Sequence, residues 1–207
     1  MSRKTPVERA NYFFCVRVTN PAIHKSIQDA LDWILDKDPQ YTDFCYTKEM
    51  LHVTLCEVKL DTDEEIECAR KVLLDLQKDL ESNLPKEKLV IKGMTTFFEK
   101  VLVAEVEYEQ QFRVFADLLK SKLKDAGVKV IENHDFRPHL TVMKVSTMRA
   151  RRAKVAKINP WLYVHLKTTP FGEQGIHSVH LCRMGYDRRD DGFYVTPAEI
   201  FFDQDLD

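Results

Sequence analysis

Two short segments of the chain share one pattern, a histidine and a threonine one residue apart inside an apolar run. The first is MLHVTLCEV, with His52 and Thr54, and the second is PHLTVMKV, with His139 and Thr141. Both runs have the β-branched and apolar composition of strands. Because side chains alternate across a strand, each His-Thr pair lies on one face and its apolar neighbours lie on the other. A helix would cover the apolar face, so we expect both pairs on an uncovered sheet face or in a cleft.

The elements predicted around these strands form a loose repeat. NYFFCVRV is a predicted strand, and Asn20 and Pro21 follow it at the N-cap and first turn of a helix. Thr62 and Glu65 form a capping box that opens a second helix after the first motif. The strands KLVIKGM and VLVAEVEY, a helix ending at Gly127 and the short strand VKVIE precede the second motif, and DRRDDG is a hairpin signal near the end. This order predicts an α+β fold with two lobes.

Length and composition limit the class of protein. The chain has 207 residues, 44% of them hydrophobic, and no linker-like segment, so we expect a single domain over residues 1–207. The net charge of −2 argues against binding to long nucleic acid, whereas a short or small phosphorylated ligand fits it. The five cysteines lack the paired spacing of a zinc site, so no metal is expected. No apolar stretch is long enough to span a membrane and no signal peptide is recognisable, which predicts a cytoplasmic or nuclear protein without membrane contact.

Two facing histidines can divide one reaction between them. An imidazole titrates near neutral pH, so one ring can accept a proton while the other donates one, as phosphodiester cleavage requires. A threonine hydroxyl beside each imidazole can donate a hydrogen bond to a phosphate oxygen. This chemistry needs no metal or other cofactor. If both pKa values lie near the reference of about 6.5, kcat/KM should be bell-shaped with its maximum between about pH 6 and 8.

A simpler interpretation of each motif is the polar face of an amphipathic strand. Average residue frequencies give about 0.2 chance occurrences of His-x-Thr in a chain of this length. Two occurrences, both inside apolar strands, favour the catalytic interpretation.

At these residues the chain resembles the two-histidine (2H) phosphoesterases, whose signature is a pair of H-x-[ST]-hydrophobic motifs. HVTL and HLTV match that signature. NYFFCVRVTN, FRPHLTVMKVS, PFGEQ and LCRM resemble the branch that contains the central, 2′,5′-phosphodiesterase-like domain of A-kinase anchor protein seven. The likeness runs from about residue 10 to 202.

The resemblance implies a bilobal fold, with two pseudo-symmetric sheet lobes, helices outside and a central cleft. It assigns catalysis to the four motif residues, which we call the quartet: His52, Thr54, His139 and Thr141. It also implies a substrate, 2′,5′-oligoadenylate, in which the free 3′-hydroxyl attacks the phosphorus, the 5′-oxygen leaves and a cyclic phosphate forms. Which histidine is the acid and which the base stays open.

Other activities remain alternatives. Opening a 2′,3′-cyclic phosphate or processing the 3′ end of RNA would use the same four residues. A module that binds a mononucleotide such as AMP, or that anchors a kinase, would need no turnover. We recognise no C-terminal amphipathic helix that a kinase regulatory subunit would bind, so the resemblance extends better to the enzyme than to the anchor. We expect a monomer.

Substrate-binding residues are predicted from their positions near the motifs. Phe98, Phe136 and Phe171 lie at strand ends or loops, where a ring could stack on a base, although such rings are more often core. Arg149 and Arg152 in MRARRAK could bind substrate phosphates. That basic segment is equally consistent with a solvated face or a nuclear-import patch.

Overall fold

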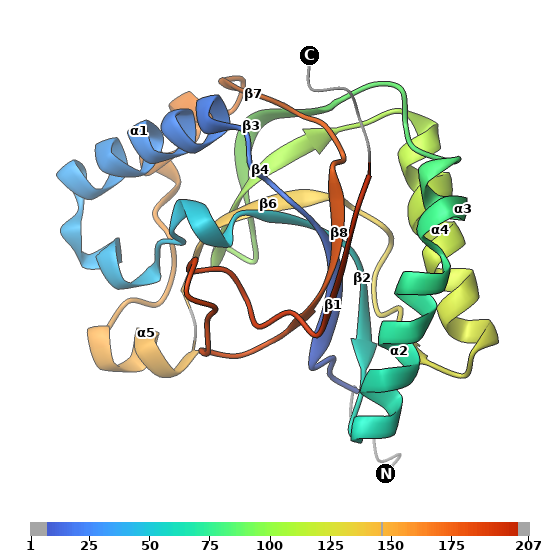
Figure 1. The fold of residues 1–207 in the computed structure, drawn as a ribbon. Coiled ribbons are helices and arrows are strands. Elements are labelled where there is room, and N and C mark those ends of the chain that lie inside the picture. Colours follow the sequence, from blue (N-terminus) through green and yellow to red (C-terminus); the bar gives the residue numbers. More distant parts are fainter. Residues whose placement is uncertain (1–7, 146, 203–207) are drawn as a thin grey trace, which may run out of the picture.

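The computed structural model describes residues 8–145 and 147–202, in which nine strands form one antiparallel sheet with helices packed around it (Figure 1). The strands are β1 (Tyr12–Arg17), β2 (His52–Lys59), β3 (Leu89–Phe97), β4 (Val101–Glu107), β5 (Lys129–Ile131), β6 (His139–Lys144), β7 (Pro170–Gln174), β8 (Ser178–Arg183) and β9 (Ala198–Phe201). The α-helices are α1 (Pro21–Lys37), α2 (Asp63–Asp75), α3 (Gln77–Glu81), α4 (Gln110–Asp125) and α5 (Thr147–Ala153). Short 3₁₀ helices cover Pro39–Phe44, Lys48–Met50, Pro160–Leu162 and Val164–Leu166.

The helix starts follow from the capping residues of the sequence. The Asn20 side chain accepts a hydrogen bond from the backbone N–H of Ala22 at 2.9 Å, and a proline occupies the first turn of α1. Thr62 and Glu65 form the reciprocal capping box that opens α2. The apolar residues that repeat with helical spacing in α1 are buried, namely Ile23, Ile27, Ala30, Leu31 and Ile34.

The sheet consists of two groups of strands that meet between the motif strands. Its order is β7-β3-β4-β6-β2-β1-β8-β9, with β5 added to β2. The first group is β7, β3, β4 and β6, and the second is β2, β1, β8 and β9. The groups join where Val53 of β2 pairs with Leu140 of β6, and both side chains are fully buried. The expected two lobes are therefore halves of one open sheet.

The helices lie on the outside of the two lobes. In Figure 1, α2, α3 and α4 lie together beside β2, while α1 and α5 lie at the other end of the molecule. α1 packs against β7, α2 against β9, and α4 against β5 and β2. This arrangement leaves the motif residues on the sheet face that the helices do not cover. None of the described helices is long and apolar enough to cross a membrane.

Candidate active site

The junction between the lobes brings the two motifs together. In an antiparallel pair, residues on either side of a register point face each other across the strands and share one side of the sheet. Continuing the Val53–Leu140 register by one residue in each direction gives two cross-strand pairs, His52 with Thr141 and Thr54 with His139. The quartet therefore lies on the face opposite the buried Val53 and Leu140. All four quartet residues are partly exposed, and the first five residues of β2 and β6 have the same burial pattern.

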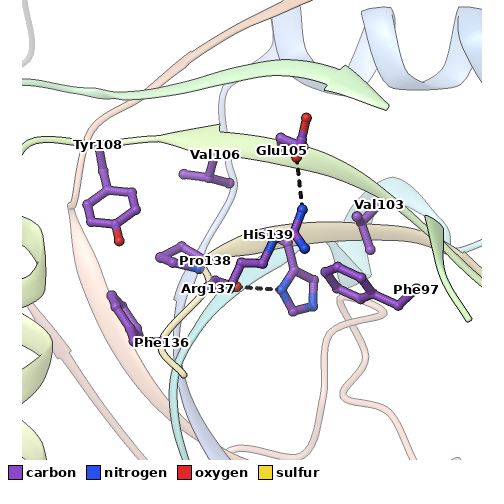
Figure 2. A pocket seen from close by; sticks show the side chains of 9 residues that line it. All are labelled: Phe97, Val103, Glu105, Val106, Tyr108, Phe136, Arg137, Pro138 and His139. Atoms are coloured by element: carbon purple, nitrogen blue, oxygen red, sulfur yellow. Dashed lines mark hydrogen bonds and ion pairs between the residues drawn. The ribbon is translucent and has the colours of Figure 1, made fainter. Parts of the chain in front are cut away.

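Each of the two histidines makes the same kind of hydrogen bond, from its ring to a backbone carbonyl oxygen two residues earlier. Nδ1 of His52 lies 2.8 Å from the Met50 carbonyl oxygen, and Nδ1 of His139 lies 2.8 Å from the Arg137 carbonyl oxygen (Figure 2). A carbonyl oxygen can only accept, so Nδ1 donates in both rings and the neutral tautomer keeps a lone pair on Nε2. Neither Nε2 has a hydrogen-bond partner among the described residues. Each ring therefore offers Nε2 as a base when neutral and as an acid when protonated.

Aromatic rings cover His52. The Phe13 ring lies 4.8 Å from its imidazole, and the Tyr194 ring meets it edge-on at 5.2 Å. Burial lowers the pKa of His52 to about 4, and the positive charges of His139 and Arg188 lower that pKa further. The hydrogen bond to Met50 opposes this shift without overcoming it. At neutral pH, His52 is held in the form that accepts a proton.

His139 faces a pocket of about 120 Å³ on the β4 side of the junction (Figure 2). Phe97 meets its imidazole edge-on at 4.9 Å, and the Arg137 guanidinium lies 4.9 Å from the centre of the Phe97 ring. Arg137 also makes an ion pair with Glu105 at 3.0 Å. Burial lowers the pKa of His139, and the Arg137 charge lowers it further, while the hydrogen bond to the Arg137 carbonyl raises it.

Arg188 is a site residue that sequence reasoning missed, because DRRDDG was read only as a hairpin signal. Its guanidinium lies 4.5 Å from the centre of the Tyr194 ring, which contacts His52. Nη1 donates hydrogen bonds to the carbonyl oxygens of Gly185 at 2.8 Å and Asp187 at 2.7 Å. Within residues 8–145 and 147–202 Arg188 makes no ion pair with a carboxylate. It is a fixed, uncompensated cation close to the first histidine.

The three predicted phenylalanines occupy different environments. Phe136 lines the His139 pocket, where Lys120 Nζ lies 4.4 Å from the centre of its ring. Phe98 is 86% exposed in the β3–β4 turn, and the ring that reaches His139 belongs to its neighbour Phe97. Phe171 is only 2% exposed and is part of the hydrophobic core. The prediction that Phe171 stacks on a base is wrong, because almost none of this side chain is exposed to a ligand.

The two predicted arginines belong to α5. Arg152 is exposed and is not among the described residues that line the His139 pocket. Arg149 lies in the same helix, and its side chain is outside the part of the structure that is described. Among the described residues, no group of three or more histidine, cysteine, aspartate or glutamate side chains could hold a metal ion.

Comparisons with known proteins agree with this geometry. Residues 10–202 match the family described as the AKAP7 2′5′ RNA ligase-like domain. The chain is 28% identical over 196 residues to human A-kinase anchor protein 7 isoform gamma, covering 92% of this chain and 56% of that protein. The chain therefore spans little more than half the length of this relative.

Solved structures share the fold at low sequence identity. Escherichia coli LigT complexed with 3′-AMP has a TM-score of 0.60 at 14% identity, covering 95% of this chain and all of LigT. The PDE domain of MHV ns2 has a TM-score of 0.57 at 13% identity, covering 86% of this chain and all of that domain.

The family match over residues 10–202, together with the two His-x-Thr motifs that the fold brings together, places the chain among the 2H phosphoesterases. Within that class, the chain belongs to the AKAP7 2′5′ RNA ligase-like domain family.

Proposed function

We propose that the protein is a metal-independent phosphodiesterase of short nucleotides and that 2′,5′-oligoadenylate is its favoured substrate. The observation that carries the proposal is the duplicated imidazole geometry. Two rings on paired strands are each tied through Nδ1 to a carbonyl oxygen, which leaves Nε2 of both available for proton transfer. One acid and one base on one face suit an in-line displacement at phosphorus.

We assign the base to His52 and the acid to His139. The lowered pKa of His52, about 4, keeps its Nε2 unprotonated over the working pH range. Nε2 of His52 takes the proton of the 3′-hydroxyl as that oxygen bonds to phosphorus. The bond between phosphorus and the 5′-oxygen breaks, and Nε2–H of His139 gives its proton to the leaving oxygen. The products are a 2′,3′-cyclic phosphate and a free 5′-hydroxyl, and the two histidines have exchanged protonation states.

The other site residues would stabilise the charge and orient the nucleotide. Thr54 and Thr141 lie beside the imidazoles and can donate to the non-bridging phosphate oxygens, on which charge accumulates. Arg188 supplies a guanidinium whose charge no carboxylate neutralises. Phe97 and Phe136 in the His139 pocket are the rings best placed to contact a base. LigT has been solved in complex with 3′-AMP, which supports a small nucleotide as ligand.

The test is incubation of the protein with 2′,5′-linked and 3′,5′-linked triadenylate, followed by identification of the products by mass. We expect cleavage of the 2′,5′ linkage with a cyclic phosphate product, and equal activity in excess EDTA because the two imidazoles carry out the proton transfers. His52→Ala and His139→Ala should lose most of the activity, whereas the exposed His134→Ala is a matched control that should retain it. Loss of activity on chelation, restored by a divalent ion, would contradict the mechanism.

Further substrates separate the alternatives. Turnover of a 2′,3′-cyclic phosphate or of an RNA 3′ end without cleavage of 2′,5′-triadenylate would favour the other 2H chemistries. AMP binding without any turnover would favour a binding module. Kinase anchoring is suggested only by the name of a relative that is much longer than this chain.

A further inference from the structure

A second pocket, of about 350 Å³, lies away from the quartet. It is formed between the β3–β4 turn and the segment that follows β6. Val145 and Val155 are apolar lining residues, and Lys100, Arg151 and Lys154 bring three positive charges to the pocket. Lys100 belongs to the turn, whereas Arg151 and Lys154 come from α5 and the residue after it, so two separate segments contribute cations.

The three cations have no acidic partners. No lining residue is acidic, and in the described part of the chain none of the three side chains makes an ion pair. The nearby Lys157, by contrast, makes an ion pair with Glu99. Three like charges around one hollow repel each other and raise its positive potential, which an anion would relieve. The pocket is therefore suited to phosphate groups.

Strained backbone surrounds this pocket. Three described residues other than glycine have positive φ: Phe98 at 52°, Glu99 at 55° and Lys154 at 55°. Two of them form the turn before Lys100, and the third lines the pocket. The turn is held by hydrogen bonds from Val145 N to the Lys100 carbonyl oxygen at 2.8 Å and from Ile158 N to the Glu99 carbonyl oxygen at 2.7 Å. Disfavoured backbone conformations persist where the surroundings fix them, and they concentrate at functional sites.

An exposed aromatic ring accompanies the cations. Phe98 is 86% exposed at the tip of the turn, two residues before Lys100. An exposed ring next to a group of lysines and arginines is the combination that binds single-stranded nucleic acid, because bases stack on the ring and phosphates meet the cations.

The pocket and the active site are connected by one strand. β6 begins at His139, and Val145, six residues further on, lines the pocket. At roughly 3.3 Å per residue the two sites are roughly 20 Å apart along the strand. A stacked single strand that rises roughly 3.4 Å per nucleotide would cover this distance with about six nucleotides.

We propose that this pocket binds backbone phosphates of a single-stranded oligonucleotide several nucleotides from the scissile bond, with a base stacked on Phe98. The proposal rests on the proposed function in that the bound strand is a longer substrate. A dinucleotide in the active site would not reach the pocket. The pocket would make the enzyme sensitive to the length of its substrate.

Direct binding tests the proposal without requiring turnover. The probe is a fluorescent ten-nucleotide deoxyoligoadenylate, which has no hydroxyl beside its phosphates and is not cleaved, and its affinity is measured by anisotropy over a range of salt concentrations. The pocket variant combines Lys100→Gln, Arg151→Gln and Lys154→Gln. A control variant combines Lys71→Gln, Lys78→Gln and Lys88→Gln, which removes the same charge from exposed lysines elsewhere.

The pocket variant should bind the ten-mer at least tenfold more weakly in low salt. Its slope of log K against log salt should be shallower by about 2, as expected for three lost phosphate contacts at roughly 0.7 each. Affinity for a dinucleotide should not change, and the control variant should bind like wild type. Phe98→Ala should weaken binding without changing the slope. Equal losses in both triple variants, or an unchanged slope, would overturn the proposal while leaving the proposed catalytic function standing.

Discussion

The pH dependence of kcat/KM is the sharpest test of the active site, since the environment of the two histidines lowers both pKa values and so shifts the pH optimum below that expected for free histidines. Burial lowers the pKa of His52 to about 4 and lowers that of His139 below its usual 6.5. With His52 as base, activity is lost as the pH falls through about 4. With His139 as acid, activity is lost as the pH rises through a pKa below 6.5. The optimum of kcat/KM should lie between about pH 4 and 6.5, below the range of 6 to 8 that the sequence suggested.

The size of the effect follows from the alkaline limb. Each pH unit above the pKa of the acid reduces the fraction of protonated His139 tenfold, so kcat/KM should be at least roughly tenfold below its maximum at pH 7.5 and roughly a hundredfold at pH 8.5. The two limbs belong to the pair of coupled imidazoles. A bound phosphodiester is negatively charged and raises both pKa values, so the profile of kcat should lie at higher pH than that of kcat/KM.

The assay measures initial rates on a 2′,5′-linked diadenylate well below KM, from pH 4 to 10 at constant ionic strength. Far-UV circular dichroism at each pH checks that the fold is retained. A kcat/KM that rises steadily to pH 10 would refute the reasoning, because hydroxide or another strong base would then generate the nucleophile.

Three further predictions follow from individual side chains. Alanine at either quartet histidine should lower kcat by roughly 100-fold to 10,000-fold, and alanine at either quartet threonine by roughly 10-fold to 1000-fold. Thermal unfolding of these variants should be unchanged. A near wild-type rate for a histidine variant would contradict the pairing of the two imidazoles. Arg188→Gln should raise KM and also shift the acidic limb of kcat/KM to higher pH, because the pKa of His52 rises when a nearby positive charge is removed. A change in KM without a shift of the acidic limb would contradict the position of Arg188 beside His52. His180 is 2% exposed, and burial lowers its pKa to about 4, below the unfolded value of 6.5. Its stabilising contribution is therefore present above about pH 6.5 and is lost progressively as the pH falls from about 6.5 to about 4, by about 3 kcal/mol in total. Denaturant unfolding at pH 7 and 4.5 measures this fall in the free energy of unfolding, which should be smaller in His180→Asn. If the variant lost as much stability as wild type, other groups would be responsible for the loss.

The quartet could be found from the sequence because its geometry is local. Strand alternation alone separates His52 and Thr54 from Val53, and the same reasoning applies at His139. The helix caps at Asn20 and Thr62 are equally local, since each involves side chains within three residues. The pairing of the two motif strands was implied by the family resemblance and not by either motif alone.

The aromatic residues were harder to predict because a turn decides which ring faces the site. Phe97 is the last residue of β3, and two successive residues with positive φ, neither of them glycine, follow it. Such a turn normally has Asn or Gly at those positions, so this turn cannot be predicted from the sequence. Phe171 was misjudged for a different reason. Its neighbour Gly172 approaches Ile23 of α1 so closely that a Cβ atom there would lie 2.9 Å from the Ile23 side chain, and this long-range packing buries the strand under the helix.

The pKa values of the histidines also depend on residues remote in the sequence, and this is how two identical motifs can acquire different roles. The hydrogen bond at Nδ1 is the same in both rings, so it cannot distinguish acid from base. The difference comes from the covering groups: Phe13 and Tyr194 enclose His52, and the uncompensated Arg188 lies behind Tyr194, whereas His139 borders an open pocket. None of these covering groups belongs to a motif. The repeated motif supplies two equivalent imidazoles, and the asymmetric surroundings from β1 and the segment after β8 make one of them the weaker base and the one that stays neutral.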